Sequence, residues 1–402
     1  MNILMLCNKS PWPPLEGGPI AMNAMAEGLV NAGHTVKILA INSNKYSVDP
    51  RQIPREYRDK TRIETVYLDL SVKWLPALKC FLSHKSYHIE RFISPAFART
   101  LKDILRNEKF DIIQFETLFT TPYIPLISSF SNTRLVLRAH NIEHLIWKRM
   151  ADNCLNPVKR FYLRHLAKTL REYELSILPT LHGIVAITAK DAEWFQGQAP
   201  GIPVTDIPFG IMPDAPPEQG NSTKKDTGND LFHLGSMNWQ PNLEGIRWFV
   251  KNVWPELHQN FPDLKLHLAG RAMPEWMVRM KMPGVFVDGE VEDAAVYMQS
   301  HGIMVVPLFS GSGIRIKIIE GMRAGKTIIT TTVGAEGIDY SDRKNILIAN
   351  NKEEFIHAVR QCQANPDLVR ILGANARELV ISRHNNSLLM EKLTDFYSAL
   401  LP

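Results

Sequence analysis

Apolar residues follow two spacings along this chain, and each predicts a different kind of element. Short uninterrupted apolar runs predict buried strands, and apolar residues three and four positions apart predict helices. The first series predicts a strand from Asn2 to Leu6, a helix from Ile20 to Ala32 and a strand from Thr35 to Ile41. Gly33 suits the end of the helix. The chain therefore opens with a βαβ unit, in which we expect parallel strands.

The same two spacings recur over the rest of the chain and predict two α/β domains. Further strands are predicted at residues 110–114, 134–138, 183–188, 231–234, 264–269, 284–291, 303–306 and 327–333. Pro213 to Asp230 interrupts the series with Pro, Gly, Ser, Asn and charged residues, which is typical of a linker. A chain of 402 residues is long enough for two domains of ordinary size. We therefore expect one domain over residues 1–212 and a second over residues 213–384.

The segment Ile303–Gly337 carries the most specific chemistry. A predicted strand is followed by the loop Ser310-Gly311-Ser312-Gly313 and then by a helix over Ile314–Ala324. Backbone N–H groups at the start of a helix favour phosphate oxygens. Arg315 and Lys317 stand in that first turn, where cations oppose the helix dipole unless an anion lies beside them. The pattern predicts a phosphate site, with a purely structural glycine loop as the alternative.

This segment, GSGIRIKIIEGMRAGK followed by a β-branched run and GAEG, resembles the donor-binding segment of the GT-B glycosyltransferases. The resemblance is to the large family 4 of retaining enzymes (glycosyl transferases group 1). It implies that Glu320 contacts the nucleotide ribose. It also implies that the preceding loop, Ser310, Gly311, Ser312, Gly313 and Ile314, holds the diphosphate and the sugar. Ser312 stands where the family usually has a first glutamate, eight positions before Glu320.

Two positions in the first domain resemble the same family. Gly17 and Gly18 lie in the predicted turn between the first strand and its helix, where open parallel sheets bind ligands. The resemblance places this loop beside the donor phosphates. His140 follows the strand Arg134–Arg138, and the resemblance brings it to the donor sugar, where a neutral imidazole can share a proton. The alternatives are a glycine pair that only makes a tight turn and a histidine held in a loop network.

Two further donor contacts are implied in the second domain, at Gly235 and Val291. Many family members carry an arginine and a lysine in the Gly235 turn, but this chain has Ser236 and Asn242 nearby. We therefore expect Arg315 and Lys317 to neutralise the diphosphate, with no metal ion and no cofactor beyond the donor substrate. The turn ending at Val291 is implied to meet the nucleotide base. A final helical stretch, about residues 385–402, is implied to pack back on the first domain.

Charge and aromatic content suggest an anionic partner for the first domain. Residues 1–200 hold 26 Lys and Arg against 18 Asp and Glu, a net charge of +8, whereas the whole chain carries +5. The predicted helical region Ile146–Leu178 interleaves cations with Trp147, Phe161 and Tyr162. It can meet an anionic acceptor or lipid, or it can simply be a solvated face. For Leu75–Leu82, a helix that covers the sheet is favoured over one that lies on a bilayer.

The remaining features place the chain among cytoplasmic proteins, with possible contact at the inner membrane face. Four scattered cysteines form no CxxC pair and fit a reducing compartment, and no long apolar segment predicts a membrane span. No nucleic-acid motif is present. By resemblance, the fold is GT-B, two Rossmann-like domains facing each other across a cleft. The implied activity moves a sugar from a nucleotide diphosphate sugar to a glycan or lipid-linked acceptor, with retention, in cell-surface polysaccharide synthesis. A sugar-nucleotide epimerase and a non-catalytic nucleotide-sugar-binding protein remain alternatives.

Overall fold

The structure, a computed structural model, describes residues 1–14, 17–211, 230–311 and 313–402. Ser312 and most of the predicted linker, residues 213–229, lie outside the described residues, as does the expected domain end at Met212. The chain divides into two compact units. Unit 1 comprises Met1–Gly210 together with Asn386–Pro402, and unit 2 comprises Ile211–Asn385. The C-terminal helix therefore belongs to the same unit as the N-terminus.

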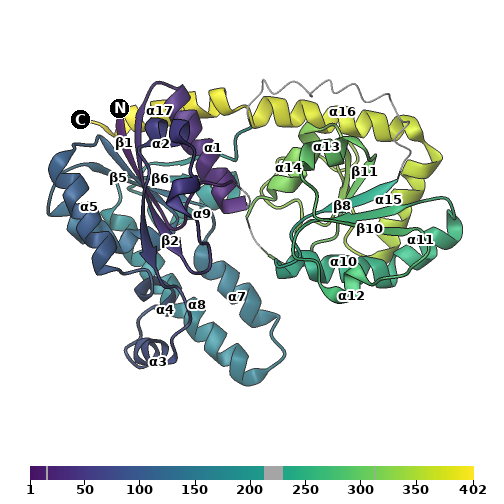
Figure 1. The fold of residues 1–402 in the computed structure, drawn as a ribbon, viewed down its shortest axis with the longest axis horizontal. Helices are drawn as coiled ribbons and strands as arrows, with labels where there is room; N and C mark the ends of the chain where they lie inside the picture. Colours follow the sequence, from purple (N-terminus) through teal and green to yellow (C-terminus); the bar gives the residue numbers. More distant parts are fainter. Residues whose placement is uncertain (15–16, 212–229, 312) are drawn as a thin grey trace. The chain divides into compact units, whose positions relative to one another are not determined.

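Unit 1 is built on a parallel sheet of seven strands in the order β3-β2-β1-β4-β5-β6-β7 (Figure 1). The strands are β1 (Asn2–Cys7), β2 (Thr35–Ser43), β3 (Glu64–Leu68), β4 (Ile112–Glu116), β5 (Arg134–Ala139), β6 (Gly183–Ala186) and β7 (Val204–Asp206). The order reverses direction at β1, which pairs with β2 on one side and β4 on the other. Ligands bind at such a switch point, beyond the carboxyl ends of the strands.

Helices bury both faces of this sheet. The helices of unit 1 are α1 (Gly17–Asn31), α2 (Arg55–Thr61), α3 (Trp74–Leu82), α4 (Tyr87–Glu90), α5 (Pro95–Asn107), α6 (Ile124–Ser128), α7 (Glu143–Asp152), α8 (Pro157–Ile177), α9 (Ala189–Gln198) and α17 (Asn386–Leu400), with 3-10 segments η1 (Pro50–Gln52), η2 (Leu118–Tyr123) and η3 (Leu178–Thr180). Because side chains alternate along a strand, Ile3 and Met5 pack with α1 and α17, and Leu4 and Leu6 pack on the opposite face with α5. Figure 1 shows the first helix, α1, and the C-terminal helix, α17, side by side.

Unit 2 repeats this architecture around a parallel sheet of six strands in the order β10-β9-β8-β11-β12-β13. Its strands are β8 (Leu231–Leu234), β9 (Leu266–Ala269), β10 (Val285–Gly289), β11 (Ile303–Val306), β12 (Thr327–Thr330) and β13 (Leu347–Ile348). Its helices are α10 (Gln240–Asn252), α11 (Trp254–Asn260), α12 (Glu275–Val278), α13 (Ala294–Gln299), α14 (Ile316–Arg323), α15 (Lys352–Ala364) and α16 (Pro366–Arg383). Both units are therefore Rossmann-like, with ligand-binding edges at the carboxyl ends of their strands.

Three predicted elements differ from the structure. Helix α1 begins at Gly17, so Gly17 and Gly18 form the first turn of the helix and not a separate turn before it. At this position the lack of a side chain costs little stability. The predicted long helix of residues 146–178 is two helices, α7 and α8, because Asn156 caps a new start before Pro157. Helix α3 does not cover the sheet. It packs against α7 and α8 and buries only Cys80, which leaves most of its apolar residues exposed.

Candidate functional site

His140 of unit 1 lies in a cluster of charged groups at the carboxyl edge of the sheet. Glu116 is the last residue of β4 and pairs with Arg138 of the neighbouring strand β5. The Nε2 atom of His140, two residues further on, lies 2.6 Å from Oε2 of Glu116. Nη1 of Arg138 donates to the same oxygen at 3.0 Å. Both Glu116 and Arg138 are buried, and His140 is the partly exposed member of the group.

The charges of this cluster fix the state of the imidazole. Burial alone would raise the pKa of Glu116, but the charge of Arg138 and the hydrogen bond to His140 hold it below its usual value. Burial lowers the pKa of His140 despite the carboxylate beside it. At neutral pH an ionised Glu116 can only accept, so the neutral imidazole carries its hydrogen on Nε2. Nδ1 then holds the lone pair and can accept a hydrogen bond from a hydroxyl group.

A chain of buried hydrogen bonds orients Glu116 from behind. The side-chain amide of Gln114 donates to its other oxygen, Oε1, and Tyr397 of α17 donates to the amide oxygen of Gln114. All three residues are fully buried. Such supporting bonds hold a functional side chain in one geometry. The C-terminal helix therefore contributes to the position of His140, a role that no local sequence signal indicates.

Lys9 lies beside the start of α1. A Cβ atom built on Gly18 would lie 3.2 Å from Nζ of Lys9, so a side chain there would crowd the lysine. The ammonium group sits 4.1 Å from the centre of the Tyr46 ring, and its charge contributes to lowering the pKa of His140. Gly17 itself is exposed. Gly18 thus leaves room for the ammonium group of Lys9, a cation near His140 that the sequence analysis did not single out.

A second buried cluster, with the acidic pair Glu143 and Glu174, lies just beyond His140, at the start of α7. Oε1 of Glu174 accepts from the backbone N–H of Glu143 at 3.0 Å, and its Oε2 lies 2.6 Å from Nδ1 of His144. Burial, followed by the nearby charge of Glu174, raises the pKa of Glu143 to about 8. Glu143 is therefore largely protonated at neutral pH. His144 packs in this cluster and is not solvent-exposed.

In unit 2 the structure brings Lys317 to the Gly235 turn. Lys317 is the second residue of α14, and its Nζ lies 2.6 Å from Oδ1 of Asn242 and 3.3 Å from Nε2 of His233. A Cβ atom on Gly235 would come within 2.8 Å of the same Nζ. Gly235 therefore lets the ammonium group approach the backbone beyond β8. This brings together two residues that the sequence analysis had assigned to the donor site.

The surroundings of Lys317 depress its basicity. Burial, together with the positive charge of Arg315, lowers the pKa of Lys317 to about 7. His233 is buried and stays neutral, because burial and the charge of Lys317 lower its pKa well below the usual value. Its Nδ1 faces the carbonyl oxygen of Val305 at 2.8 Å and must carry the hydrogen, so Nε2 offers a lone pair to the lysine. An anion placed here would restore the charge on Lys317.

The glycine loop before α14 is shaped by two residues in the left-handed region. Gly311 has φ +102° and Gly313 has φ +79°, conformations that residues with a side chain rarely adopt. Arg315 directly precedes α14, donates to the carbonyl of Gly313 and holds its guanidinium 5.4 Å from the centre of the Trp239 ring. Ser310 and Ile314 flank the loop and are partly exposed. The assignment of Ser312 to the donor falls outside the described residues.

The two remaining predicted donor residues occupy different elements of unit 2. Glu320 lies one turn beyond Lys317 in α14 and is partly buried, which raises its pKa against the opposing charge of Arg323. Val291 is partly exposed just after β10, which ends at Gly289 in the left-handed conformation, φ +77°. The carbonyl of Gly289 accepts from the N–H of Gly270 at 2.7 Å, which ties this turn to the end of β9.

Comparison with known proteins identifies the class of protein that this fold defines. A family model described as Glycosyltransferase Family 4 matches residues 17–215, and one described as Glycosyl transferases group 1 matches residues 228–365. Together with two Rossmann-like sheets, these matches identify the chain as a glycosyltransferase of the GT-B type. One curated relative is an uncharacterised 44.6 kDa protein in the cps region of Klebsiella pneumoniae. It is 20% identical over 394 residues, which is 96% of this chain and 97% of the relative.

Solved structures share the fold over nearly the whole chain. Sucrose-phosphate synthase from Thermosynechococcus elongatus is 16% identical, with a TM-score of 0.69, and the match covers 100% of this chain and 99% of that one. HepE of Anabaena, solved with UDP and glucose, is 13% identical with a TM-score of 0.66, and covers 99% and 100%. WaaG, a glycosyltransferase involved in lipopolysaccharide biosynthesis, is 15% identical with a TM-score of 0.65, and covers 98% and 99%. The expected GT-B fold is confirmed.

None of the helices in the described part of the chain combines the length and the apolar character that crossing a bilayer requires. All four cysteines are free thiols.

Proposed function

We propose that this glycosyltransferase moves a sugar from a nucleoside diphosphate sugar to a glycan or lipid-linked acceptor, with retention at the anomeric carbon. The observation that carries the proposal is Lys317, an ammonium group held at the Gly235 turn with a pKa of about 7. A cation held in place before the reaction begins is suited to a departing diphosphate. The match to Glycosyltransferase Family 4 supports the donor class, and retention follows from the family resemblance.

The proposed chemistry is leaving-group stabilisation by protein groups. As the anomeric C–O bond to the diphosphate breaks, negative charge gathers on the diphosphate. The acceptor hydroxyl oxygen forms the new bond to the anomeric carbon, and its proton passes to a diphosphate oxygen. Lys317 takes up or keeps its proton and donates a hydrogen bond to a phosphate oxygen. Gly311 and Gly313 let backbone N–H groups approach the same oxygens. Glu320 accepts from the ribose hydroxyls. His140 accepts a hydrogen bond from a sugar hydroxyl through Nδ1 and so orients the donor. The backbone beside Val291 contacts the nucleotide base. Protein cations take the place of a metal ion in this step.

Acceptor and biological setting are proposed from what relatives are described as doing. WaaG acts in lipopolysaccharide biosynthesis, and the Klebsiella relative lies in a cps region. These descriptions support a role in the synthesis of a cell-surface polysaccharide for this chain as well. Four free thiols support a cytoplasmic location. UDP is the first nucleotide to test, because HepE was solved with it.

The test is a thermal-shift screen of the purified protein with UDP, GDP, ADP, dTDP and CMP, followed by incubation with the matching sugar nucleotides. A ligand at about a hundred times its dissociation constant adds about 2.7 kcal/mol of stability. NMR of the products then separates the possible activities. Release of nucleoside diphosphate only with acceptor, and a product of unchanged anomeric configuration, supports the proposal. Conversion of the donor without acceptor would show an epimerase, and binding without turnover a non-catalytic protein.

A peripheral contact with an anionic membrane completes the proposal. Helix α3 presents Trp74 and Leu82, each 71% exposed, on a face that also carries Leu75 and Leu78. The ring of Phe81 lies 6.4 Å from that of Phe161 at the start of α8, where Leu155 and Val158 are also exposed. Figure 1 shows α3 and the α7–α8 hairpin extending away from the sheet of unit 1. Exposed apolar residues of this extent mark an interaction surface.

Cations around this surface favour an anionic bilayer as its partner. Lys79 and Lys159 are exposed on the same two helices, and each such cation near an anionic surface contributes about 1 kcal/mol. In a vesicle sedimentation assay, the protein should bind phosphatidylglycerol vesicles and not neutral phosphatidylcholine ones. The double variant Trp74→Ser and Leu78→Ser should lose binding. The control variant Phe130→Ser, another exposed aromatic residue, should bind as the wild type does. Wild-type binding by the double variant would rule out this surface.

A further inference from the structure

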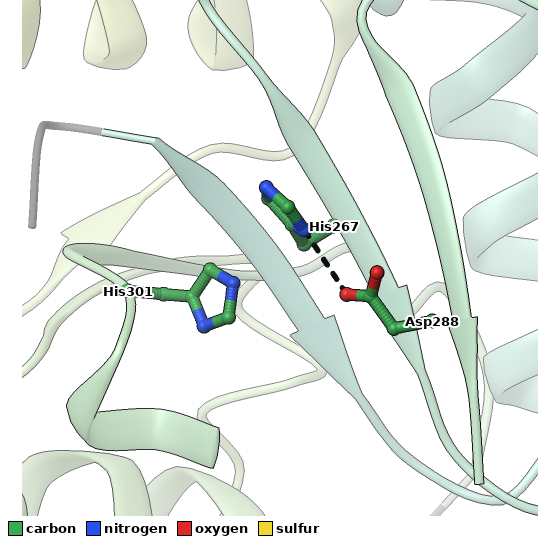
Figure 2. A group of neighbouring side chains, drawn as sticks. All are labelled: His267, Asp288 and His301. Carbon is green, nitrogen blue, oxygen red and sulfur yellow. Dashed lines mark hydrogen bonds and ion pairs between the residues drawn. The ribbon is translucent and has the colours of Figure 1, made fainter. Parts of the chain in front are cut away.

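Two histidines and an aspartate gather on one face of the sheet of unit 2, and the proposed transfer does not use them. His267 is the second residue of β9, Asp288 lies in β10, and His301 follows α13 and precedes β11 (Figure 2). His301 stands before the amino end of its strand, whereas Gly235 follows the carboxyl end of β8. In a parallel sheet these positions lie at opposite edges. The group therefore shares no residue with the predicted phosphate site, and only Asp288 lies near the carboxyl end of its strand.

The strand register explains why two of these side chains meet. His267 is paired with Phe286 in the neighbouring strand. Asp288, two residues beyond Phe286, shares the face of His267, although the pairing register shifts between Val287 and Gly289. Nδ1 of His267 lies 3.0 Å from Oδ2 of Asp288, the contact drawn as a dashed line in Figure 2. Histidine and aspartate thus converge by the geometry of the sheet itself.

Tyr297 of α13 orients the other two members of the group. Its carbonyl oxygen lies 2.9 Å from Nδ1 of His301. Since a carbonyl only accepts, that nitrogen carries the hydrogen, and Nε2 is left with the lone pair. The hydroxyl of Tyr297 donates to Oδ2 of Asp288 at 2.6 Å. A histidine N–H that donates to a backbone carbonyl and a hydroxyl that donates to a carboxylate are the usual supports of metal ligands.

The spacing of the group suits a divalent ion. One ligand atom from each of His267, Asp288 and His301 lies within 4.8 Å of the other two. The two imidazole centres are 4.5 Å apart with ring planes inclined at 56°. With metal–nitrogen bonds of about 2.1 Å, two imidazoles on one tetrahedral ion have centres about 5 Å apart. The side chains of His267 and Asp288 are 20% and 30% exposed, so an ion can enter from solvent.

We propose that His267, Asp288 and His301 form a binding site for a divalent cation of the zinc class, with the fourth position left to water. Two imidazoles and one carboxylate favour Zn²⁺ over Mg²⁺ or Ca²⁺, which prefer oxygen ligands. The bound ion ties the segment between α13 and β11 to the edge strand β10 and its neighbour β9. Asp288 directly precedes Gly289, where the turn toward Val291 begins. Occupancy therefore stabilises unit 2 and the turn that the proposed function assigns to the base.

The test is a calorimetric titration of chelator-treated protein with ZnCl₂, followed by a thermal scan. We expect one Zn²⁺ per chain and a rise in Tm on binding. The variants His301→Ala and Asp288→Asn should each weaken binding at least tenfold and lose that rise. The matched control is His357→Ala, which removes an exposed histidine from α15 of the same unit. Titration with CoCl₂ gives a second readout, because coordination by two imidazoles changes the visible absorption of the Co²⁺ ion.

Two results would overturn the metal site. The first is Zn²⁺ binding by His301→Ala and Asp288→Asn that equals that of the wild type, and the second is loss of binding in His357→Ala. Circular dichroism of each variant without metal checks that the protein is folded, and Asp288→Asn preserves the volume of its side chain. UDP binding is measured separately in the presence of chelator. A negative result for the metal site therefore does not argue against the proposed transferase activity. A negative result for UDP binding likewise does not argue against the metal site.

Discussion

The ammonium nitrogen of Lys317 lies 2.6 Å from the side-chain oxygen of Asn242. Asn242 stands in the region where the resembled family carries a cation for the diphosphate, and here an amide supports a cation from another helix. The same amide donates through Nδ2 to the carbonyl of Ser236, so its oxygen is turned toward the lysine. His233 completes the support from the strand below. The positive charge of the turn thus comes from α14 and not from α10.

The pH dependence of nucleotide affinity should report directly on Lys317. Its pKa is about 7 in the free protein, and a bound diphosphate raises it. The complex then binds more protons than the free protein, so affinity for UDP should fall as pH rises from about 7 to 9, by up to about tenfold per unit. Calorimetry across this range measures the slope. Lys317→Arg, which stays charged, should remove the slope. A slope unchanged in that variant would assign the titration to another group.

Substitutions at Asn242 should move this titration in opposite directions. Asn242→Leu removes the acceptor at 2.6 Å, lowers the pKa of Lys317 further and should weaken UDP binding about tenfold, the value of one hydrogen bond to a charged group. Asn242→Asp adds a carboxylate and should shift the loss of affinity to higher pH. The same calorimetric series measures both. If both variants follow the wild-type pH profile, Asn242 does not position the lysine.

Most strands and the domain pattern of this protein could be read from the sequence because both depend on local spacing, whereas the short edge strands β3, β7 and β13 were not predicted. Apolar runs such as Ile303–Val306 predicted strands, and the position of His140 after such a run marked it for attention. The start of α1 was placed too late, because Gly17 and Gly18 suit a turn as well as the first turn of a helix. The periodicity of α3 indicated which residues share a face, but not that this face would stay exposed.

Contacts that depend on the order of the strands could not be predicted. Glu116 reaches His140 because β4 and β5 are neighbours, and the sequence does not state which strands pair. The only hint in the sequence was that Glu116 is an acidic residue at the end of an apolar strand. His233 and Asn242 lie 84 and 75 residues from Lys317. The spacing of His267, Asp288 and His301 in the sequence likewise matches no metal-binding motif. The expectation of no metal site was therefore made because the sequence does not show that these residues lie together.

His140 and Glu116 should separate activity from stability. His140→Ala removes the partly exposed member of the cluster and leaves the Glu116–Arg138 pair at 3.0 Å in place. It should reduce turnover about tenfold, because the donor loses one orienting hydrogen bond, with little change in unfolding free energy. Glu116→Gln instead leaves the buried charge of Arg138 without its carboxylate and should cost about 3–5 kcal/mol of stability. Urea unfolding and turnover assays on both variants decide the matter. Equal stability losses would mean that His140 is a structural residue.

Glu320→Gln should weaken UDP binding without loss of stability. Burial raises the pKa of Glu320, so the folded state holds the proton more tightly than the unfolded state does. Its ionisation therefore costs stability as pH rises above about 4.5 toward the folded pKa. The glutamine variant avoids that cost and should melt at or above the wild-type Tm at neutral pH. Thermal scans with and without UDP measure both effects, with Glu336→Gln, a carboxylate in the GAEG turn, as a comparison. Undiminished UDP affinity would remove Glu320 from the donor site.

Glu143 makes the sharpest prediction about stability and pH. Its pKa is raised to about 8, above the value near 4.5 that it has when unfolded, because it is buried beside Glu174. Stability from this group is fully present below about pH 4.5 and is lost as pH rises toward 8. Glu143→Gln should therefore be more stable than the wild type at about pH 8 and nearly equal to it at about pH 5. Urea unfolding at the two pH values measures the difference in unfolding free energy. The control Glu172→Gln, at an exposed residue of the neighbouring helix α8, should change the unfolding free energy at neither pH. A stability difference that does not depend on pH would show that Glu143 titrates normally, and that the buried pair carries its charge at neutral pH.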